Sequence, residues 1–175
     1  MMTPKQRLFE LLRTRSFQRG EFTLASGKKS DFFIDCKRTV LSAEGLVLAG
    51  EAMLRELEDS NLDDVSAIAA VPLGGVPLAD AVVHSAFARG KAYDLLYIRK
   101  EKKDHGTEQR VEGAKNVPSG SKIVLLEDVV TTGGSSLRAI ESLRSAGYEL
   151  ICLLALVDRL EGGRENLEAA GVSFR

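Results

Sequence analysis

The sequence predicts an α/β fold, a doubly wound and mostly parallel sheet with helices on both faces. The run VSAIAAV at 65–71 is apolar without alternation, which is typical of a strand covered on both faces. Apolar runs then alternate with stretches of helical spacing, and this alternation requires right-handed crossovers between parallel strands. The predicted strands are 65–71, 93–99, 122–129 and 150–158, and the predicted helices are 77–89, 134–146 and 163–170.

The N-terminal part precedes this core. Thr3 and Pro4 are an N-cap and first-turn signal for a helix whose apolar face we expect to carry Leu8, Leu11, Leu12 and Phe17. Residues 22–38 read as two short strands around a Ser-Gly-Lys-Lys turn. Ser42 is expected to cap the next helix. We expect one domain over 1–175, with about 1–40 forming a helix and a small N-terminal subdomain, the hood, and about 65–160 forming the core sheet.

The composition is that of an ordinary globular protein. The chain has 175 residues, 44% of them hydrophobic, and a formal net charge of -1, so bulk charge points to neither nucleic acid nor an anionic membrane. No signal peptide and no apolar run of about 20 residues is visible, and we expect a cytoplasmic protein. Cys36 and Cys152 lie in apolar runs and are expected to be buried thiols.

The segment 100–118 is polar and has no apolar periodicity. A loop of this length in a compact domain is usually functional or disordered, and we expect a mobile catalytic loop. Its start is rich in cations, with Arg99, Lys100, Lys103 and His105 close together in YIRKEKKDHG. Cations of this kind stabilise a leaving group that develops negative charge, although a solvated charged surface explains the same pattern.

The stretch IVLLEDVVTTGGS at 123–135 carries the strongest chemical signal. In an open α/β sheet, ligands bind at the carboxyl ends of the strands, and this stretch lies at such an end before a predicted helix. Backbone amides and hydroxyls of 131–135 suit a phosphate group. Glu127 and Asp128 suit vicinal hydroxyls, which donate to carboxylates. An acid pair beside a phosphate-binding turn predicts a site for ribose 5-phosphate.

The commoner nucleotide-binding loops are absent from the sequence. It contains neither G-x-G-x-x-G after a strand nor G-x-x-x-x-G-K-[ST]. A purely structural role, with Asp128 as a simple cap of the turn, is the alternative to a ribose phosphate site. It leaves two adjacent carboxylates at a strand end without partners, which is unfavourable.

The stretch VLLEDVVTTGGS resembles the phosphoribosyl pyrophosphate (PRPP) motif of the type I phosphoribosyltransferases. RKEKKDHG resembles the catalytic loop of the orotate phosphoribosyltransferases, FTLASGKKSDFFID their N-terminal signature, and VDRLEGG at 157–163 their segment with an orotate-binding arginine. VPLGGVPLA resembles the pyrophosphate loop of the wider class. The resemblance implies the type I phosphoribosyltransferase fold and the transfer of a phosphoribosyl group from PRPP to orotate in pyrimidine synthesis.

The resemblance also implies site residues. Those expected to act in catalysis are Lys103, Arg99, Lys100, His105 and Asp128. Those expected to bind PRPP are Arg99, Lys100, Lys103, His105, Glu127, Asp128, Val129, Val130, Thr131, Thr132, Gly133, Gly134, Ser135, Leu73 and Gly74. Those expected to bind orotate are Thr131, Arg159 and Phe33. Arg159 pairing with Glu161 on the surface is the structural alternative for that arginine.

Mg²⁺ is the implied cofactor, held through PRPP and water and not by a protein cage. A homodimer is implied, with the 100–118 loop reaching the neighbouring subunit's site. Some family members carry lysine where this chain has Ala25 and Gly74, and Lys28 or Lys29 is a candidate to compensate. A phosphoribosyltransferase for another nucleobase and a non-catalytic PRPP-binding regulator remain the alternatives.

Overall fold

The computed structural model describes residues 2–23, 27, 29–60, 62, 64–99 and 111–175. These residues form a five-stranded sheet of order β5-β4-β3-β6-β7 and a separate two-stranded sheet, β1-β2. The parallel strands are β3 (Val65–Ala70), β4 (Asp94–Ile98), β6 (Lys122–Val130) and β7 (Glu149–Asp158), and β5 (Val111–Glu112) is antiparallel to β4. The mostly parallel sheet confirms the predicted fold class.

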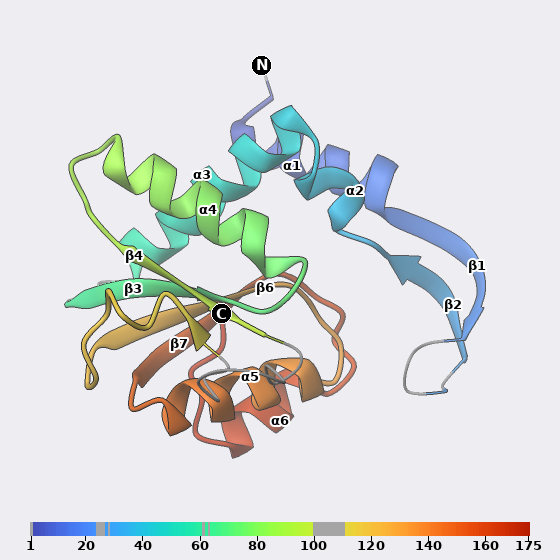
Figure 1. The fold of residues 1–175 in the computed structure, drawn as a ribbon. Coiled ribbons are helices and arrows are strands. Elements are labelled where there is room, and N and C mark those ends of the chain that lie inside the picture. Colours follow the sequence, from blue (N-terminus) through green and yellow to red (C-terminus); the bar gives the residue numbers. More distant parts are fainter. Residues whose placement is uncertain (1, 24–26, 28, 61, 63, 100–110) are drawn as a thin grey trace.

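Helices cover both faces of the main sheet (Figure 1). One face carries α3 (Ala43–Asp59) and α4 (Gly75–Phe87), with α1 (Pro4–Leu11) beside α3, and the other carries α5 (Gly134–Ser145) and α6 (Gly163–Ala169). Neighbouring residues of β3 point to opposite faces, so Ile68 packs in the cluster of α3 and α4 while Ala69 packs in that of α5. This double coverage explains the apolar run without alternation.

The first helix begins as predicted but ends earlier. Thr3 and Gln6 form a reciprocal capping box at its start. A π-helical turn, η1 (Leu12–Ser16), then ends the helix, and Phe17 is already extended at the start of β1 (Phe17–Thr23). The prediction that Phe17 lies on the buried helix face was wrong, because Phe17 pairs with Ile34 of β2 (Lys29–Ile34) and is 37% exposed.

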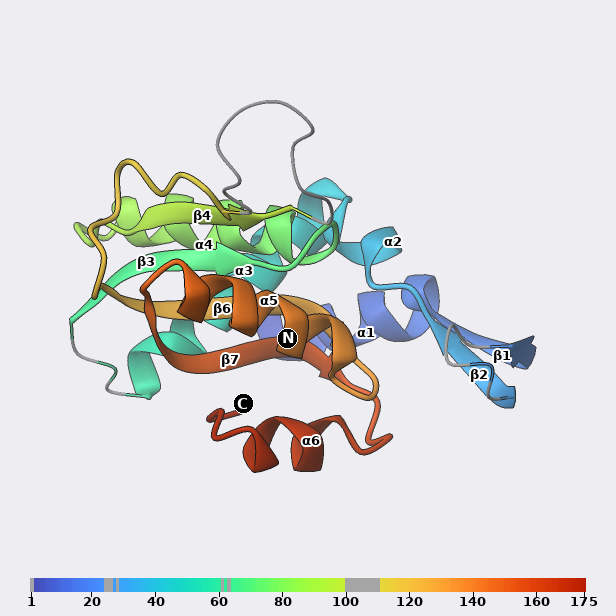
Figure 2. The same cartoon turned by 60° about the horizontal axis from the view of Figure 1, so that its bottom comes forward.

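The β1-β2 hairpin projects away from the main sheet, as Figures 1 and 2 show. A short helix, α2 (Lys37–Val40), follows it and leads into α3. At this base, the hydroxyl of Thr39 donates to the carbonyl of Leu11 at 3.2 Å and lies 2.7 Å from the hydroxyl of Ser16. Thr39 and Ser16 are fully buried, so these contacts join α2 to the end of the first helix.

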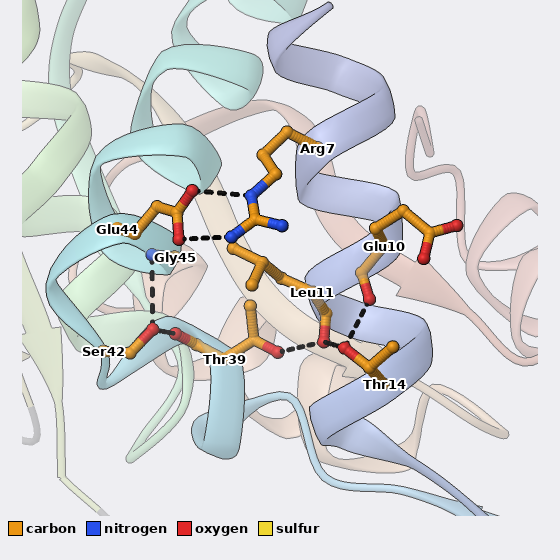
Figure 3. Close-up of polar contacts among 8 residues, drawn as sticks. All are labelled: Arg7, Glu10, Leu11, Thr14, Thr39, Ser42, Glu44 and Gly45. Atoms are coloured by element: carbon orange, nitrogen blue, oxygen red, sulfur yellow. Dashed lines mark hydrogen bonds and ion pairs between the residues drawn. The ribbon is translucent and has the colours of Figure 1, made fainter. Parts of the chain in front are cut away.

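A second connection joins α1 to α3 (Figure 3). The Arg7 guanidinium donates two hydrogen bonds, of 2.6 and 2.8 Å, to the two carboxylate oxygens of Glu44. Ser42 accepts a hydrogen bond from the Gly45 amide at 3.3 Å, which confirms Ser42 as the cap of α3. Hydrogen bonds therefore join α1, α2 and α3 to one another at the base of the hairpin.

The prediction of an irregular segment over 100–118 was wrong for its second half. Val111 and Val117 are buried, β5 pairs with β4, and Tyr148 donates to the Val117 carbonyl at 3.2 Å. A two-residue strand is too short to give a periodic pattern, so the sequence did not reveal it. Residues 100–110 lie outside the described part.

The remaining features follow the sequence closely. A parallel bridge between Leu153 and Phe174 places the C-terminal residues beside β7. Cys36 and Cys152 are buried and unpaired, as predicted. No helix in the described residues is long and apolar enough to cross a membrane.

Candidate active site

The site lies where the direction of winding of the sheet reverses. β3 leads to β4 on one side and β6 leads to β7 on the other, while β3 and β6 are neighbours in the sheet. Ligands of doubly wound folds bind at such a switch point, outside the carboxyl ends of the strands. Here the turn after β3, with Leu73 and Gly74, lies beside Asp128 of β6. The Val71 amide at the start of this turn donates to the Leu126 carbonyl of β6 at 3.1 Å.

The two predicted acids differ sharply in environment. Glu127 is 3% exposed and accepts a hydrogen bond of 3.0 Å from the Ser136 hydroxyl on α5. The pKa of Glu127 is raised to about 8, first by burial and then by the negative charge of Asp128, while the bond from Ser136 opposes the rise. Asp128 is half-buried, and its carboxylate adjoins Gly74.

The acids lie within the strand and not at its end. β6 continues through Val129 and Val130, which pair with Val157 and Asp158 of β7. Because neighbouring strand residues point to opposite faces, Glu127 meets α5 and Asp128 meets the turn after β3.

The turn after β6 leads directly into α5. Gly133 has a left-handed φ of 80° and precedes the first residue of α5, whose start has no side-chain cap among the described residues. Amides at a helix start carry partial positive charge and bind anions. Within the described part of the chain, the hydroxyls of Thr131, Thr132 and Ser135 make no side-chain hydrogen bond. These donors remain available for an anion.

The first residues of α6 pack against this turn. Asn166 donates from its side-chain nitrogen to the Thr132 carbonyl at 2.9 Å. At Gly163 an added methyl group would lie 2.6 Å from the Thr131 carbonyl oxygen and 2.5 Å from Val130 Cγ1. The close approach fixes the shape of the turn.

Arg159 follows β7 and lies beside the same turn. Its amide donates to the Val130 carbonyl at 2.9 Å. Its side chain is 3% exposed, forms an ion pair of 2.7 Å with Glu161, and donates to the Ser30 hydroxyl at 3.3 Å. The alternative pairing with Glu161 therefore exists, but Arg159 is buried and not on the surface.

The hairpin contributes Phe32 and not Phe33 to this region. The Arg159 guanidinium lies 4.6 Å from the centre of the Phe32 ring, which also stacks on Phe17. Phe33 points to the other side of the hairpin, is 37% exposed, and contacts Phe22. The expectation for Phe33 needs correction, because the register places Phe32 on the Arg159 side.

The structure describes one of the four predicted cations. Arg99 follows β4 and forms an ion pair of 3.0 Å with Glu112 on β5. Lys100, Lys103 and His105 lie outside the described residues, as do Ala25 and Lys28. Leu73 is 72% exposed in the turn after β3.

Sequence reasoning missed residues next to the acid pair. Lys37 forms an ion pair of 2.8 Å with Asp35, and its pKa is raised chiefly by that hydrogen bond and further by the charge of Asp128. Ser136 is a second case, because only the fold shows that this helix residue faces Glu127. No cluster of three or more metal-binding side chains occurs among the residues the structure describes.

An uncapped helix start and an acid pair at the switch point of a doubly wound sheet fit one class of protein, the phosphoribosyltransferases. The sequence model of the phosphoribosyl transferase domain matches residues 40–173. A protein of Sorangium cellulosum (strain So ce56) named orotate phosphoribosyltransferase is 51% identical over 96% of this chain and 86% of its own length.

Solved structures agree with this class. The orotate phosphoribosyltransferase of Mycobacterium tuberculosis H37Rv, in complex with Fe(III) dicitrate, has a TM-score of 0.81 and 33% identity, covering 99% of this chain and 94% of its own. The same enzyme in complex with PRPP has a TM-score of 0.78 and 29% identity, covering 99% of this chain and 94% of its own. The chain belongs to the orotate phosphoribosyltransferase family.

Proposed function

We propose that the protein transfers the 5-phosphoribosyl group of PRPP to orotate, giving orotidine 5′-monophosphate and pyrophosphate for pyrimidine synthesis. One observation carries this proposal: a carboxylate pair, an uncapped helix start and a buried arginine converge at one switch point. The three groups match the hydroxyls and phosphate of PRPP and the carboxylate of orotate. The family membership and the PRPP complex of the M. tuberculosis relative support the same assignment.

The ribose and its phosphate are assigned to β6 and the turn after it. Asp128 is the accessible carboxylate for a ribose hydroxyl, and Glu127 acts from its buried position beside it. The backbone of Val129 and Val130 sets the turn, and the amides and hydroxyls of 131–135 donate to the 5-phosphate.

The pyrophosphate is assigned to the turn after β3 and to the cations after β4. Leu73 and Gly74 bring backbone close to the crevice, where Gly74 leaves room for the Asp128 carboxylate. Arg99, together with Lys100, Lys103 and His105, is proposed to neutralise the charge that develops on the leaving pyrophosphate.

Orotate is assigned to Arg159, Thr131 and Phe32, with Phe32 replacing the predicted Phe33. A guanidinium binds a carboxylate through two parallel N–H groups, and Arg159 has an Nε that donates to no described residue. The aromatic ring at 4.6 Å from the guanidinium gives the planar base an apolar wall.

The reaction needs no protein nucleophile. The ring nitrogen of orotate attacks C1 of the ribose as the bond to pyrophosphate breaks, and the pyrophosphate leaves with the bonding electrons. The proton of that ring N–H is lost to water. The protein lowers the barrier by positioning the two substrates and by stabilising charge. Closure of residues 100–110 over the site would exclude water from the reactive sugar.

Mg²⁺ is proposed as the cofactor. The half-buried Asp128 carboxylate offers hard oxygen atoms that would accept hydrogen bonds from the water ligands of Mg²⁺ next to the position of the ribose. When bound, Mg²⁺ supplies positive charge to the phosphate oxygens of PRPP. We also propose a homodimer in which residues near 100–110 reach the partner's site, and a cytoplasmic location.

An assay tests the proposal. Protein, PRPP and Mg²⁺ are mixed with orotate, uracil, adenine or hypoxanthine, and the ultraviolet absorbance of orotate is followed. We expect turnover with orotate and none with uracil, adenine or hypoxanthine. Turnover with another base would support the alternative acceptor, and PRPP binding without turnover would support a regulator.

A further inference from the structure

The Arg159 side chain is already engaged by a carboxylate of its own chain. Glu161 approaches one terminal nitrogen of Arg159 at 2.7 Å, and the Glu161 side chain is 25% exposed. The neighbouring Nε of Arg159 is buried and donates to no described residue. A guanidinium presents Nε and a terminal nitrogen side by side to a carboxylate, so one nitrogen of this edge has a carboxylate partner and the other has no partner among the described residues.

The polar contacts of the Arg159 side chain within the described residues all fall on one terminal nitrogen. The Ser30 hydroxyl and the Phe32 carbonyl take longer bonds of 3.3 and 3.5 Å from the same terminal nitrogen that contacts Glu161. A buried guanidinium with an unpartnered N–H is unfavourable for the folded state. Such a group is expected where a ligand completes the bonding.

We propose that Glu161 is a positioning residue that holds the place of the acceptor's carboxylate on Arg159. An incoming base with a carboxylate replaces Glu161 and also satisfies Nε. This inference rests on the proposed function, because it assumes that Arg159 binds the carboxylate of orotate. It adds that this chain carries an internal competitor for that position.

The competition depends on the charge of the base. An acidic base exchanges one carboxylate for another on Arg159, so the buried cation stays paired throughout. A neutral base has no carboxylate to exchange, so Glu161 stays on Arg159 and takes no part in the binding of that base. Glu161 therefore weakens carboxylate binding, keeps Arg159 paired while no acidic base is present, and leaves the binding of neutral bases unaffected.

Binding of two nucleotides measures the competition without turnover. Orotidine 5′-monophosphate carries the carboxylate and uridine 5′-monophosphate lacks it, while both share the ribose 5-phosphate. Each nucleotide is titrated calorimetrically into the wild-type protein and into Glu161→Gln. The difference between the two affinities of each protein gives the contribution of the carboxylate to binding. We expect Glu161→Gln to bind orotidine 5′-monophosphate roughly fivefold more tightly, with binding of uridine 5′-monophosphate unchanged.

Glu165→Gln is the matched control. Glu165 is exposed in the first turn of α6, and its substitution makes the same change in net charge. Both affinities should stay at their wild-type values. Thermal unfolding reports whether each variant is folded. If Glu161→Gln does not fold, Glu161→Asp, which keeps the charge but withdraws it by one methylene, should show the same tightening to a smaller extent.

Two outcomes overturn the inference, and they are distinguishable. A wild-type protein that prefers orotidine 5′-monophosphate, with Glu161→Gln equal or weaker, means that Glu161 only orients Arg159, and the proposed function stands. A wild-type protein that binds both nucleotides equally means that Arg159 holds no carboxylate, and the orotate contact in the proposed function fails too. Tightening for the carboxylate-bearing nucleotide alone supports the inference.

Discussion

A methyl group added to Gly74 would lie 2.0 Å from Cγ of Asp128. The backbone of Gly74, with φ of -71° and ψ of -32°, is one that any residue adopts. Glycine is therefore required here for space and not for conformation. The Asp128 carboxylate occupies the space that a side chain at position 74 would need. Some family members have a lysine at this position, and in this chain a lysine there would require the Asp128 side chain to move.

Gly74→Ala should impair PRPP use and leave the fold intact. The carboxylate at the end of a side chain can swing away from the new methyl group, so we expect the free energy of unfolding to change by less than about 1 kcal/mol. The displaced Asp128 no longer meets the ribose, and kcat/KM for PRPP should fall about tenfold or more. Steady-state kinetics and urea unfolding measure the two effects.

A double-mutant cycle checks the cause of this loss. In a protein that already carries Asp128→Ala, the volume beside Gly74 is empty, so adding Gly74→Ala should change kcat/KM little. Equal losses in both backgrounds would show that Gly74 acts through something other than Asp128.

Glu127→Gln should make the ligand-free protein more stable than the wild-type protein, and the difference in the free energy of unfolding should grow as the pH rises. The pKa of Glu127 is raised from 4.5 to about 8 in the fold, so its ionisation opposes folding. The stability of the wild-type protein relative to the variant therefore falls between about pH 4.5 and pH 8. Near pH 7 the variant should be more stable by on the order of 3 kcal/mol, with the gap closing toward pH 4.5.

Urea unfolding of both proteins across this pH range measures the gap. Glu141→Gln, at an exposed position of α5, is the control and should show no such dependence. A difference in stability that stays constant with pH would mean that the pKa of Glu127 is not raised in the folded protein.

Thr39→Val should destabilise the protein, because it breaks the contacts that join α2 to the end of the first helix. The change preserves the shape of the side chain but leaves the Leu11 carbonyl without the 3.2 Å bond and Ser16 without its 2.7 Å partner. Both are buried, so the free energy of unfolding should fall by about 1 to 3 kcal/mol. Arg7→Ala removes the exposed ion pair with Glu44 and should shift the midpoint far less. Similar shifts for the two variants would contradict this account.

Lys103→Ala should lower kcat by about a hundredfold or more, the scale of losing one transition-state donor. Lys103 lies outside the described residues, and the prediction rests on its place in RKEKKDHG. Lys91→Ala, at an exposed lysine after α4, is the matched control. Near-normal kcat in purified Lys103→Ala would remove this lysine from catalysis.

Local patterns carried enough information for most of the core. The runs at 65–71, 122–129 and 150–158 became β3, β6 and β7 within one residue at each end, because buried parallel strands have a continuous apolar signal. The caps Thr3 and Ser42 were also read correctly, since a cap depends on its immediate neighbours.

Features set by tertiary contacts could not be read in this way. β5 is recognisable only by its pairing with β4, and the choice between Phe32 and Phe33 depends on which face of the hairpin meets Arg159. The sequence indicated that Glu127 and Asp128 belong to a site. Their different burial depends on Ser136 and Gly74, which come from other elements of the fold.

A crystal structure of the protein with PRPP and Mg²⁺ tests the account most directly. We predict the sugar's 5-phosphate within hydrogen-bonding distance of the backbone amides of 131–135 and at least one ribose hydroxyl on the Asp128 carboxylate. A PRPP molecule bound elsewhere, or bound here with its sugar turned away from both acids, would contradict the assignment.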